Sequence, residues 1–132
     1  MARKLINPPG TEAIYQQWQF SQAVQVGDTV WVSGQVGIDR EGKVPTGIEA
    51  QAKLAFENLK GVLAAAGASL EDVVELTTFH RDMKEMPGFG KVKAVYFPKD
   101  FPAWTAIGTT ELALPDLRVE IRATAVVGSG SE

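Results

Sequence analysis

The chain has 132 residues, of which 45% are hydrophobic and 22% charged, and its formal net charge at pH 7 is −3. This length predicts a single globular domain with its own core. The acidic balance argues against a nucleic-acid footprint. Because the chain has no cysteine, disulfides, thiolate nucleophiles and cysteine-bound zinc are excluded.

The N-terminal segment, residues 1–10, is too short in apolar length for a secretory signal. No stretch of the chain has the length of apolar sequence that crosses a membrane. We therefore expect a cytoplasmic protein without a membrane or nucleic-acid partner. One domain over residues 1–127 and a flexible tail over residues 128–132 are expected, because the last five residues are Gly, Ser and Glu.

The first elements along the chain predict a hairpin. Residues 19–26 and 29–34 have the loose alternation of strands. Gly27 and Asp28 between them favour a tight turn. A polar turn is expected at residues 39–43.

A long helix is the clearest element of the pattern. Thr46 and Glu49 have the spacing of a capping box, and Gly67 is typical of a helix end. Between them one apolar stripe recurs at helical spacing; it consists of Ile48, Ala52, Ala55, Phe56, Leu59, Leu63 and Ala66.

The second half predicts a strand, a helix and two more strands. Residues 72–82 are rich in residues that favour extended backbone. Pro87 opens the helix, Pro98 ends it, and Phe89, Val92 and Tyr96 share one side of it. Two alternating runs then flank a short turn at residues 114–116. The second of these runs, residues 118–125, alternates with the period of a half-buried strand.

This order predicts an α+β domain with two helices on one face of a sheet. Two helices cannot cover both faces, so the other face is either solvated or buried against another chain. Val30, Trp31 and Val32 place bulky apolar side chains on both faces of one strand. We therefore expect self-association.

Candidate catalytic residues are few. His80 is the single histidine, so no histidine-based metal cluster is expected, and we interpret it as structural or surface-exposed. A serine–histidine–aspartate site would have to combine His80 with Asp82. The spacing of Gly34, Gly37 and Gly42 is not that of a phosphate loop. No metal or cofactor is therefore expected.

Glu120 is the one acid that stands out. It lies between Arg118 and Arg122 on the same strand face, where a ladder of surface charges would have the same pattern. Nearby cations would keep its carboxylate ionised. An ionised glutamate can still accept a hydrogen bond from water and orient it for attack.

Several segments together resemble the RidA/YjgF family, the Rid superfamily of enamine/imine deaminases, also called the endoribonuclease L-PSP family. The resemblance spans roughly residues 20–126. It is carried by the strand at 31–37, the helix at 50–59, the turn at 66–74, the strand end at 79–83, Phe-Pro-Ala at 101–103, Leu-Pro at 114–115 and Val-Glu-Ile at 119–121. It implies a six-stranded mixed sheet of chorismate mutase-like fold, and a homotrimer with a central barrel and a ligand cleft at each subunit boundary.

The resemblance also implies roles for residues of the cleft. Glu120 matches the glutamate that positions the hydrolytic water, and Ser33 and Gly34 match the pocket wall. The remaining matches are substitutions: Phe20 stands where a tyrosine is usual, Trp104 where an arginine binds the substrate carboxylate, Ala106 where a cysteine is frequent, and Gly90 where an asparagine often lines the cleft.

Three functions remain open at this point. The first is a deaminase of altered specificity, in which Trp104 stacks on an aromatic or apolar substrate and Glu120 holds the water. The second is a ligand-binding or regulatory trimer without catalysis. The third, a ribonuclease or translation inhibitor, is disfavoured by the acidic balance and the single histidine. Trp104 could also simply fill the cleft. Arg81, Arg118 and Arg122 are alternative carboxylate anchors.

Overall fold

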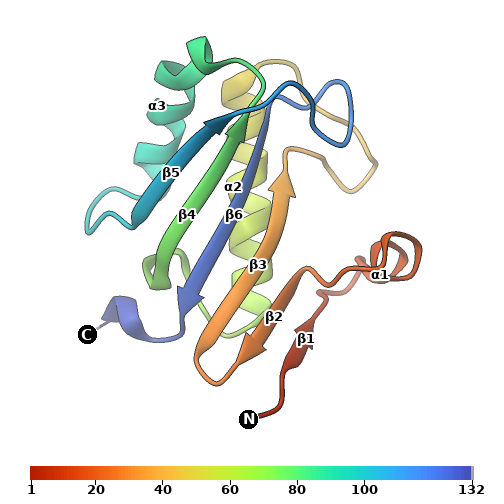
Figure 1. Cartoon of the computed structure of the whole chain (residues 1–132), viewed down its shortest axis with the longest axis vertical. Coiled ribbons are helices and arrows are strands. Elements are labelled where there is room, and N and C mark those ends of the chain that lie inside the picture. Colours follow the sequence, from red (N-terminus) through yellow and green to blue (C-terminus); the bar gives the residue numbers. More distant parts are fainter. Residues whose placement is uncertain (132) are drawn as a thin grey trace.

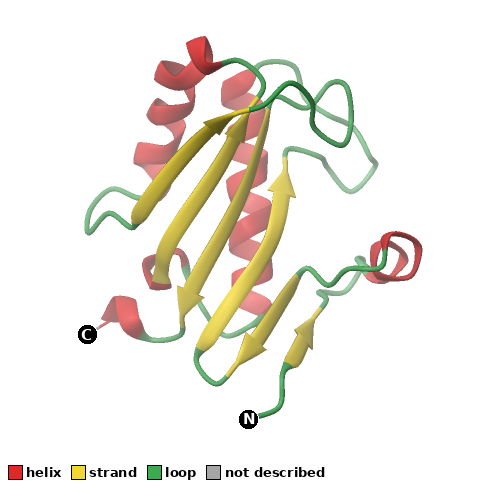
Figure 2. Cartoon of the chain, in the orientation of Figure 1, coloured by secondary structure: helices red, strands yellow, loops and turns green. Residues whose placement is uncertain are grey.

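The computed structural model describes residues 1–131 and contains one six-stranded mixed sheet, in the order β1-β2-β3-β6-β4-β5 (Figures 1 and 2). The strands are β1 (Lys4–Ile6), β2 (Ala23–Val26), β3 (Thr29–Val36), β4 (Val73–His80), β5 (Ala103–Gly108) and β6 (Val119–Val126). The helices are α1 (Glu12–Trp18), α2 (Ile48–Ala65) and α3 (Met86–Tyr96), with short 3-10 turns η1 (Leu70–Asp72), η2 (Met83–Glu85) and η3 (Ser129–Ser131).

Helices α2 and α3 lie on the same face of the sheet, behind it in the view of Figure 1. The predicted stripe of α2 is confirmed: it is buried except for Ile48, which is partly buried against the core. Phe56 of α2 stacks on Phe89 and Tyr96 of α3, with ring centroids 5.7 Å and 5.1 Å apart. These aromatic contacts join the two helices and fix the position of α3 over β4 and β5.

The sequence predicted the C-terminal end of α2 correctly but not its N-terminal cap. The predicted capping box is wrong, because Gly47 occupies the N-cap with a φ of 93° and no side chain caps the helix. Thr46 therefore lies one residue before the cap. The predicted end at Gly67 is confirmed: its φ is 78°. There the N–H of Ala68 donates to the Leu63 carbonyl, which is the bond of a glycine-terminated helix.

The N-terminal elements differ from the prediction. The hairpin about Gly27 is confirmed as β2 and β3, but its first strand begins at Ala23 rather than at Gln19. Gln19 has a left-handed φ of 59° and ends α1, a helix that buries no residue. The sequence pattern missed α1 and β1, because a three-residue strand and a helix without a buried residue carry no apolar period.

The last two strands are not joined by the predicted short turn. β5 pairs parallel with β4 after a crossover through α3. The chain then returns through residues 109–118 and places β6 antiparallel between β3 and β4. A parallel pair requires such a crossover, and the return puts β6 at the centre of the sheet.

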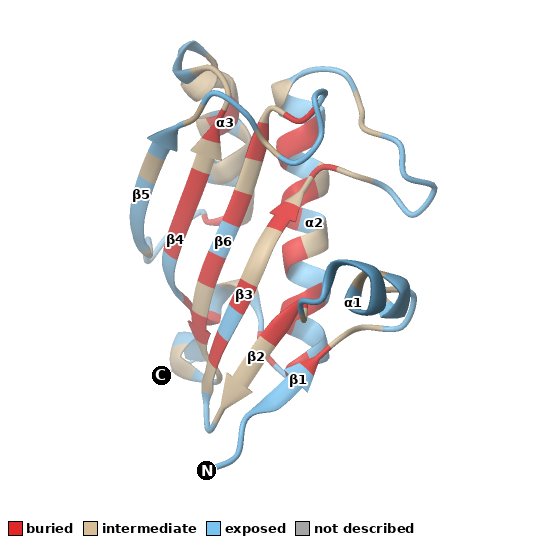
Figure 3. Cartoon of the chain, turned by 45° about the vertical axis from the view of Figure 1, so that its right-hand side comes forward, coloured by how far each residue is buried: buried red, intermediate tan, exposed pale blue. Residues whose placement is uncertain are grey.

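Side chains of β6 point alternately to the two faces of the sheet. Val119, Ile121, Ala123 and Ala125 are buried beneath the helices, and the residues between them point to the uncovered face. Figure 3 shows this alternation along the strand. Trp31 pairs with Thr124 on the uncovered face and is 49% exposed. The expectation of bulky apolar residues on both faces of β3 is confirmed.

The C-terminal residues contact η1. Where the sequence predicts a flexible tail over residues 128–132, the structure places Ser129–Ser131 in a 3-10 turn. The Gly130 N–H donates to the Asp72 carboxylate at 2.9 Å. Glu132 lies outside the described residues. Among residues 1–131, none of the helices combines the length and hydropathy needed to span a bilayer.

Gln51 is a buried amide that joins the start of α2 to the segment leading into β6. Its Nε2 donates to the carbonyl oxygens of Pro45 at 3.0 Å and Asp116 at 2.9 Å. Its Oε1 accepts from the Arg118 N–H at 2.7 Å. This amide therefore sets the approach of the chain to Glu120.

We expect Gln51→Ala to lower the free energy of unfolding by about 2–4 kcal/mol, because it leaves buried backbone groups without partners. Chemical denaturation at fixed protein concentration would measure the loss. Gln17→Ala is the matched control, since Gln17 is exposed on α1. Equal stabilities of the two variants would show that the Gln51 amide does not hold this segment.

Candidate functional site

Glu120 and Gly34 meet on the uncovered face of the sheet. A β-bulge in β3 between Val32 and Gln35 brings the Gly34 backbone against β6. A Cβ at Gly34 would stand 2.5 Å from Oε2 of Glu120. A side chain at position 34 would therefore displace this carboxylate from its place, and the two predicted site residues lie side by side.

Burial has the largest effect on the pKa of Glu120. Desolvation raises the pKa of its carboxyl, and the Arg122 guanidinium lowers it by less. No donor of residues 1–131 lies within hydrogen-bond distance of the carboxylate. Of the two flanking arginines, Arg122 acts on Glu120 as expected, whereas the Arg118 guanidinium binds Glu85 instead. A glutamate with a raised pKa can both accept and return a proton.

Ser33 and the segment that carries Phe20 lie beside this pair. The Ser33 hydroxyl donates to the carbonyl of Ser21 at 2.7 Å, and its N–H donates to the carbonyl of Gln22. These bonds hold residues 21–22 against the bulge. Phe20 precedes them directly and is 39% exposed. We call Glu120, Gly34, Ser33 and Phe20 the face group.

Trp104 lies on the other side of the sheet. It pairs with Leu76 across the β4–β5 ladder, and its Nε1–H donates to the Thr78 hydroxyl at 3.0 Å. Thr78 is fully buried beneath the helices. Trp104 is 40% exposed, and its ring lies 6.2 Å from the ring of Phe89. Trp104 thus stands at the helix-covered edge of β5.

Helix α3 presents a lysine to this tryptophan. The Lys93 Nζ lies 4.3 Å from the centre of the Trp104 ring. Ala106 pairs with Thr78 on the same side of β5. Gly90 lies one turn earlier on α3, and a Cβ there would meet open space. We call Trp104, Ala106 and Lys93 the edge group. The sequence analysis missed Lys93, although its position four residues after Phe89 places it beside the core stripe of α3.

His80 is a core residue, as the structural interpretation predicted. It is 1% exposed, its Nε2 lies 2.7 Å from the Thr78 hydroxyl, and its ring edge meets Phe89. Burial lowers the pKa of the imidazole, which therefore stays neutral at pH 7. Asp82 instead caps η2 by accepting from the Lys84 N–H. No cluster of metal-binding side chains occurs within residues 1–131.

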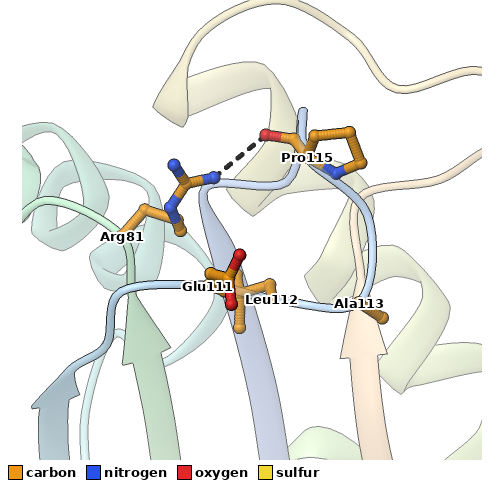
Figure 4. A pocket seen from close by; sticks show the side chains of 5 residues that line it. All are labelled: Arg81, Glu111, Leu112, Ala113 and Pro115. Atoms are coloured by element: carbon orange, nitrogen blue, oxygen red, sulfur yellow. Dashed lines mark hydrogen bonds between the residues drawn. The ribbon is translucent and has the colours of Figure 1, made fainter.

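The three arginines considered as anchors have other partners. Arg118 Nε donates to both carboxylate oxygens of Glu85 at 2.7 Å. Arg81 donates to the Pro115 carbonyl at 2.9 Å (Figure 4). Arg122 lies on the uncovered face, where its guanidinium is 5.8 Å from the Phe79 ring. None of them contacts Trp104.

Two surface hollows lie away from the predicted site. One, of about 240 Å³, is lined by Arg81, Glu111, Leu112, Ala113 and Pro115 (Figure 4). Another, of about 510 Å³, lies at the start of α2 and includes Glu85 and Arg118. Neither hollow includes a residue of the face group or of the edge group, which lie on opposite sides of the sheet.

These features define a class of α+β proteins, in which a six-stranded mixed sheet carries its long helices on one face. Comparison with known proteins identifies the family. The family model "Endoribonuclease L-PSP" matches residues 10–127. The chain belongs to this family, which is the RidA/YjgF (Rid) family of the sequence resemblance.

Individual relatives support the same assignment. A protein of Dermatophagoides farinae named 2-iminobutanoate/2-iminopropanoate deaminase is 41% identical over 110 residues, covering 82% of this chain and 85% of the relative. The solved structure of protein YJGH has a TM-score of 0.86 at 34% identity and covers 96% and 98% of the two chains. RidA from the Antarctic bacterium Psychrobacter sp. PAMC 21119 has a TM-score of 0.78 at 36% identity, covering 82% and 88%.

We expect Arg122→Met to raise the pKa of Glu120 further, because it removes the one charge that lowers it. NMR titration of the Glu120 side-chain carboxyl carbon would measure the shift. Arg40→Met is the control, since Arg40 is exposed in a loop. An unchanged midpoint in Arg122→Met would show that this arginine does not act on Glu120.

The raised pKa also gives the stability a predictable pH dependence. The folded state binds the Glu120 proton more tightly than the unfolded chain does. The contribution of this proton to stability is therefore complete below the ordinary pKa of 4.5 and is lost as the pH rises through the folded-state value. Glu120→Gln removes this slope, so its stability relative to the wild type should increase from pH 4 to pH 7.

Proposed function

We propose that the chain is an enamine/imine deaminase that hydrolyses small reactive imines to a carbonyl compound and ammonia. The observation that carries this proposal is the Glu120 carboxylate, held against Gly34 with a raised pKa and no hydrogen-bond partner among residues 1–131. Membership of a family that includes 2-iminobutanoate/2-iminopropanoate deaminases supports it.

The chemistry needs one group that moves a proton. A protonated imine is already an electrophile, so Glu120 takes a proton from water as the water oxygen bonds to the imine carbon. The product is a carbinolamine. Glu120 then gives that proton to the nitrogen. As the carbon–nitrogen bond breaks, the freed carboxylate takes the proton of the carbinolamine hydroxyl, so the carbonyl forms, and ammonia leaves and carries that proton away as ammonium. Positioning of water and substrate supplies much of the rate, and a raised pKa suits a carboxyl that must return its proton.

We propose further that the site is shared between copies of the chain. The face group and the edge group cannot meet on one ligand within a single chain, because the sheet separates them. In a homotrimer the uncovered faces would pack together, and the edge of one copy would lie against the face of the next. Half-exposed Trp31 and Ile107 on the sheet support burial of this face against another chain.

Trp104 sets the specificity in this proposal. The sequence resemblance places a carboxylate-binding arginine at its position, and an indole cannot form the bidentate pair of a guanidinium. Its exposed ring face instead offers a flat apolar surface for the substrate. We therefore expect a substrate range shifted away from that of arginine-containing relatives.

Imines generated in situ from several amino acids and from carboxylate-free amines would test the activity. We expect wild-type turnover that falls at least about 100-fold in Glu120→Ala, the scale of lost general acid–base catalysis. Trp104→Arg should shift the preference toward carboxylate-bearing imines. A wild type inert on every imine would contradict the proposal. A gain of turnover by Trp104→Arg in that case would favour a ligand-binding role.

Mixing two inactive variants would test the shared site. Glu120→Ala keeps an intact edge group, and Trp104→Glu keeps an intact face group. After co-refolding, random assembly should restore about one quarter of the wild-type activity, because each site takes one group from each of two neighbours. Sedimentation would check for the trimer. A co-refolded mixture as inactive as its components, despite normal assembly, would contradict a shared site.

A further inference from the structure

We propose that Lys93 is an amine nucleophile that forms a Schiff base with small apolar carbonyl compounds at the edge group. This inference goes beyond the proposed function, in which water attacks an imine and Glu120 moves the proton. It rests on where the Lys93 amine lies, on the open space beside it, and on how its surroundings differ from those of the other lysines.

Lys93 differs in exposure from every other lysine of the chain. It is half-buried on α3, whereas each of the other lysines is exposed. Lys93 stands four residues after the buried Phe89, so its stem runs along the rim of the core rather than into solvent. Lys91 lies two residues earlier on the same helix, but it pairs with Glu49 at 3.8 Å on the surface.

The Lys93 amine lies among aromatic rings rather than acids. Its Nζ is 4.3 Å from the centre of the Trp104 ring and 6.0 Å from that of Phe97. Among residues 1–131, no Asp or Glu oxygen lies within 4.0 Å of Nζ. An ammonium that loses water without gaining a counter-ion is costly. Burial therefore lowers the pKa of Lys93, with no charged group among the causes.

A lysine is nucleophilic only as the neutral amine. Burial among apolar groups increases the neutral fraction near pH 7, and lysines that form Schiff bases depend on this effect. A lysine at the surface keeps its proton, because water stabilises the charged form. The chain has no cysteine, so no thiol competes with Lys93 for a carbonyl compound.

Small residues beside Lys93 leave room for a ligand. Gly90 precedes it by about one helical turn, and a Cβ at Gly90 would meet open space. Ala106 lies on the same face of β5 as Trp104 and carries only a methyl group. The Trp104 N–H donates to Thr78, so the indole offers a ligand its apolar ring face. These neighbours favour a compound that joins a carbonyl group to a small apolar body.

The reaction is a reversible condensation. The Lys93 lone pair attacks the carbonyl carbon, and a proton passes from the nitrogen to the oxygen through solvent water, which gives a carbinolamine. The carbinolamine takes a proton from solvent and loses water, which leaves an iminium ion. This ion is a cation in the place of the ammonium, so the Trp104 ring face attracts it as well. Addition of water reverses these steps and frees the lysine.

Reductive trapping tests the inference on the wild-type protein. Cyclohexanone is the probe, because it is apolar and carries no carboxylate. Cyanoborohydride at pH 7 donates a hydride to the iminium carbon and leaves a stable secondary amine. Peptide mass spectrometry then measures the rate of labelling at each lysine. We expect Lys93 to be labelled at least about ten times faster than Lys91.

Lys91 is the internal control, since it lies on the same helix of the same folded molecule. Two variants check the assignment. Lys93→Arg keeps a positive charge over the ring but has no amine, so it should lose the fast label, and Lys91→Met should keep it. Equal labelling rates of Lys93 and Lys91 in the wild type, or a fast label that persists in Lys93→Arg, would overturn the inference.

Labelling and imine turnover separate the two proposals. Glu120→Ala should keep the fast label, because no proton transfer by Glu120 enters the condensation. If Lys93 is labelled fast but no imine is hydrolysed, the Schiff base stands and the deaminase proposal fails. If imines are hydrolysed and Lys93 is labelled no faster than Lys91, the inference fails and the deaminase proposal stands.

Discussion

The sheet carries its long helices on one face only, and the alternation of β6 decides which residues go to which side. Its odd-numbered residues form the floor of the core, while Glu120 and Arg122 point to the uncovered face. β5 extends the same sheet by one edge, where Trp104 turns toward the helices. Because side chains alternate along a strand, Glu120 and Trp104 lie on opposite faces of the same sheet.

Helix α3 packs on α2 and covers the β5 edge of the sheet. Phe89 and Tyr96 stack on Phe56 of α2, and Lys93 of the same helix lies over Trp104 of the edge strand β5. The β4–β5 pair is parallel, so the crossover helix must return over the same face. The same core contacts that stabilise the fold therefore position the Lys93–Trp104 contact and the partly buried hydrogen bond from Trp104 to Thr78.

Strong periodic signals in the sequence predicted the α2 stripe, the hairpin about Gly27, β4 and the alternation of β6. The failures have physical causes. Gly47 occupies the N-cap of α2, so the capping-box spacing of Thr46 and Glu49 predicted the wrong N-terminal residue. β1 exists only because β2 offers it a partner. The position of β6 between β3 and β4 is a long-range pairing that local alternation does not encode.

The sequence marked every residue of the face group and of the edge group except Lys93. The resemblance marked Glu120, Gly34 and Trp104, but the charge of Glu120 depends on burial and on Arg118 being bonded to Glu85, and neither is visible along a strand. Lys93 was missed because a lysine beside a helical apolar stripe has the same pattern whether it faces water or an indole. Only the β5 register, which brings Trp104 under α3, distinguishes the two.

The contact between Gly34 and Glu120 constrains how this sequence can change over generations. A side chain at position 34 would occupy the space of the carboxylate, so a change at one position acts on the other. A lineage that acquires a side chain at 34 must therefore move the acid at 120 from its present position or shorten it. One substitution on β3 can thus displace a carboxylate that belongs to β6.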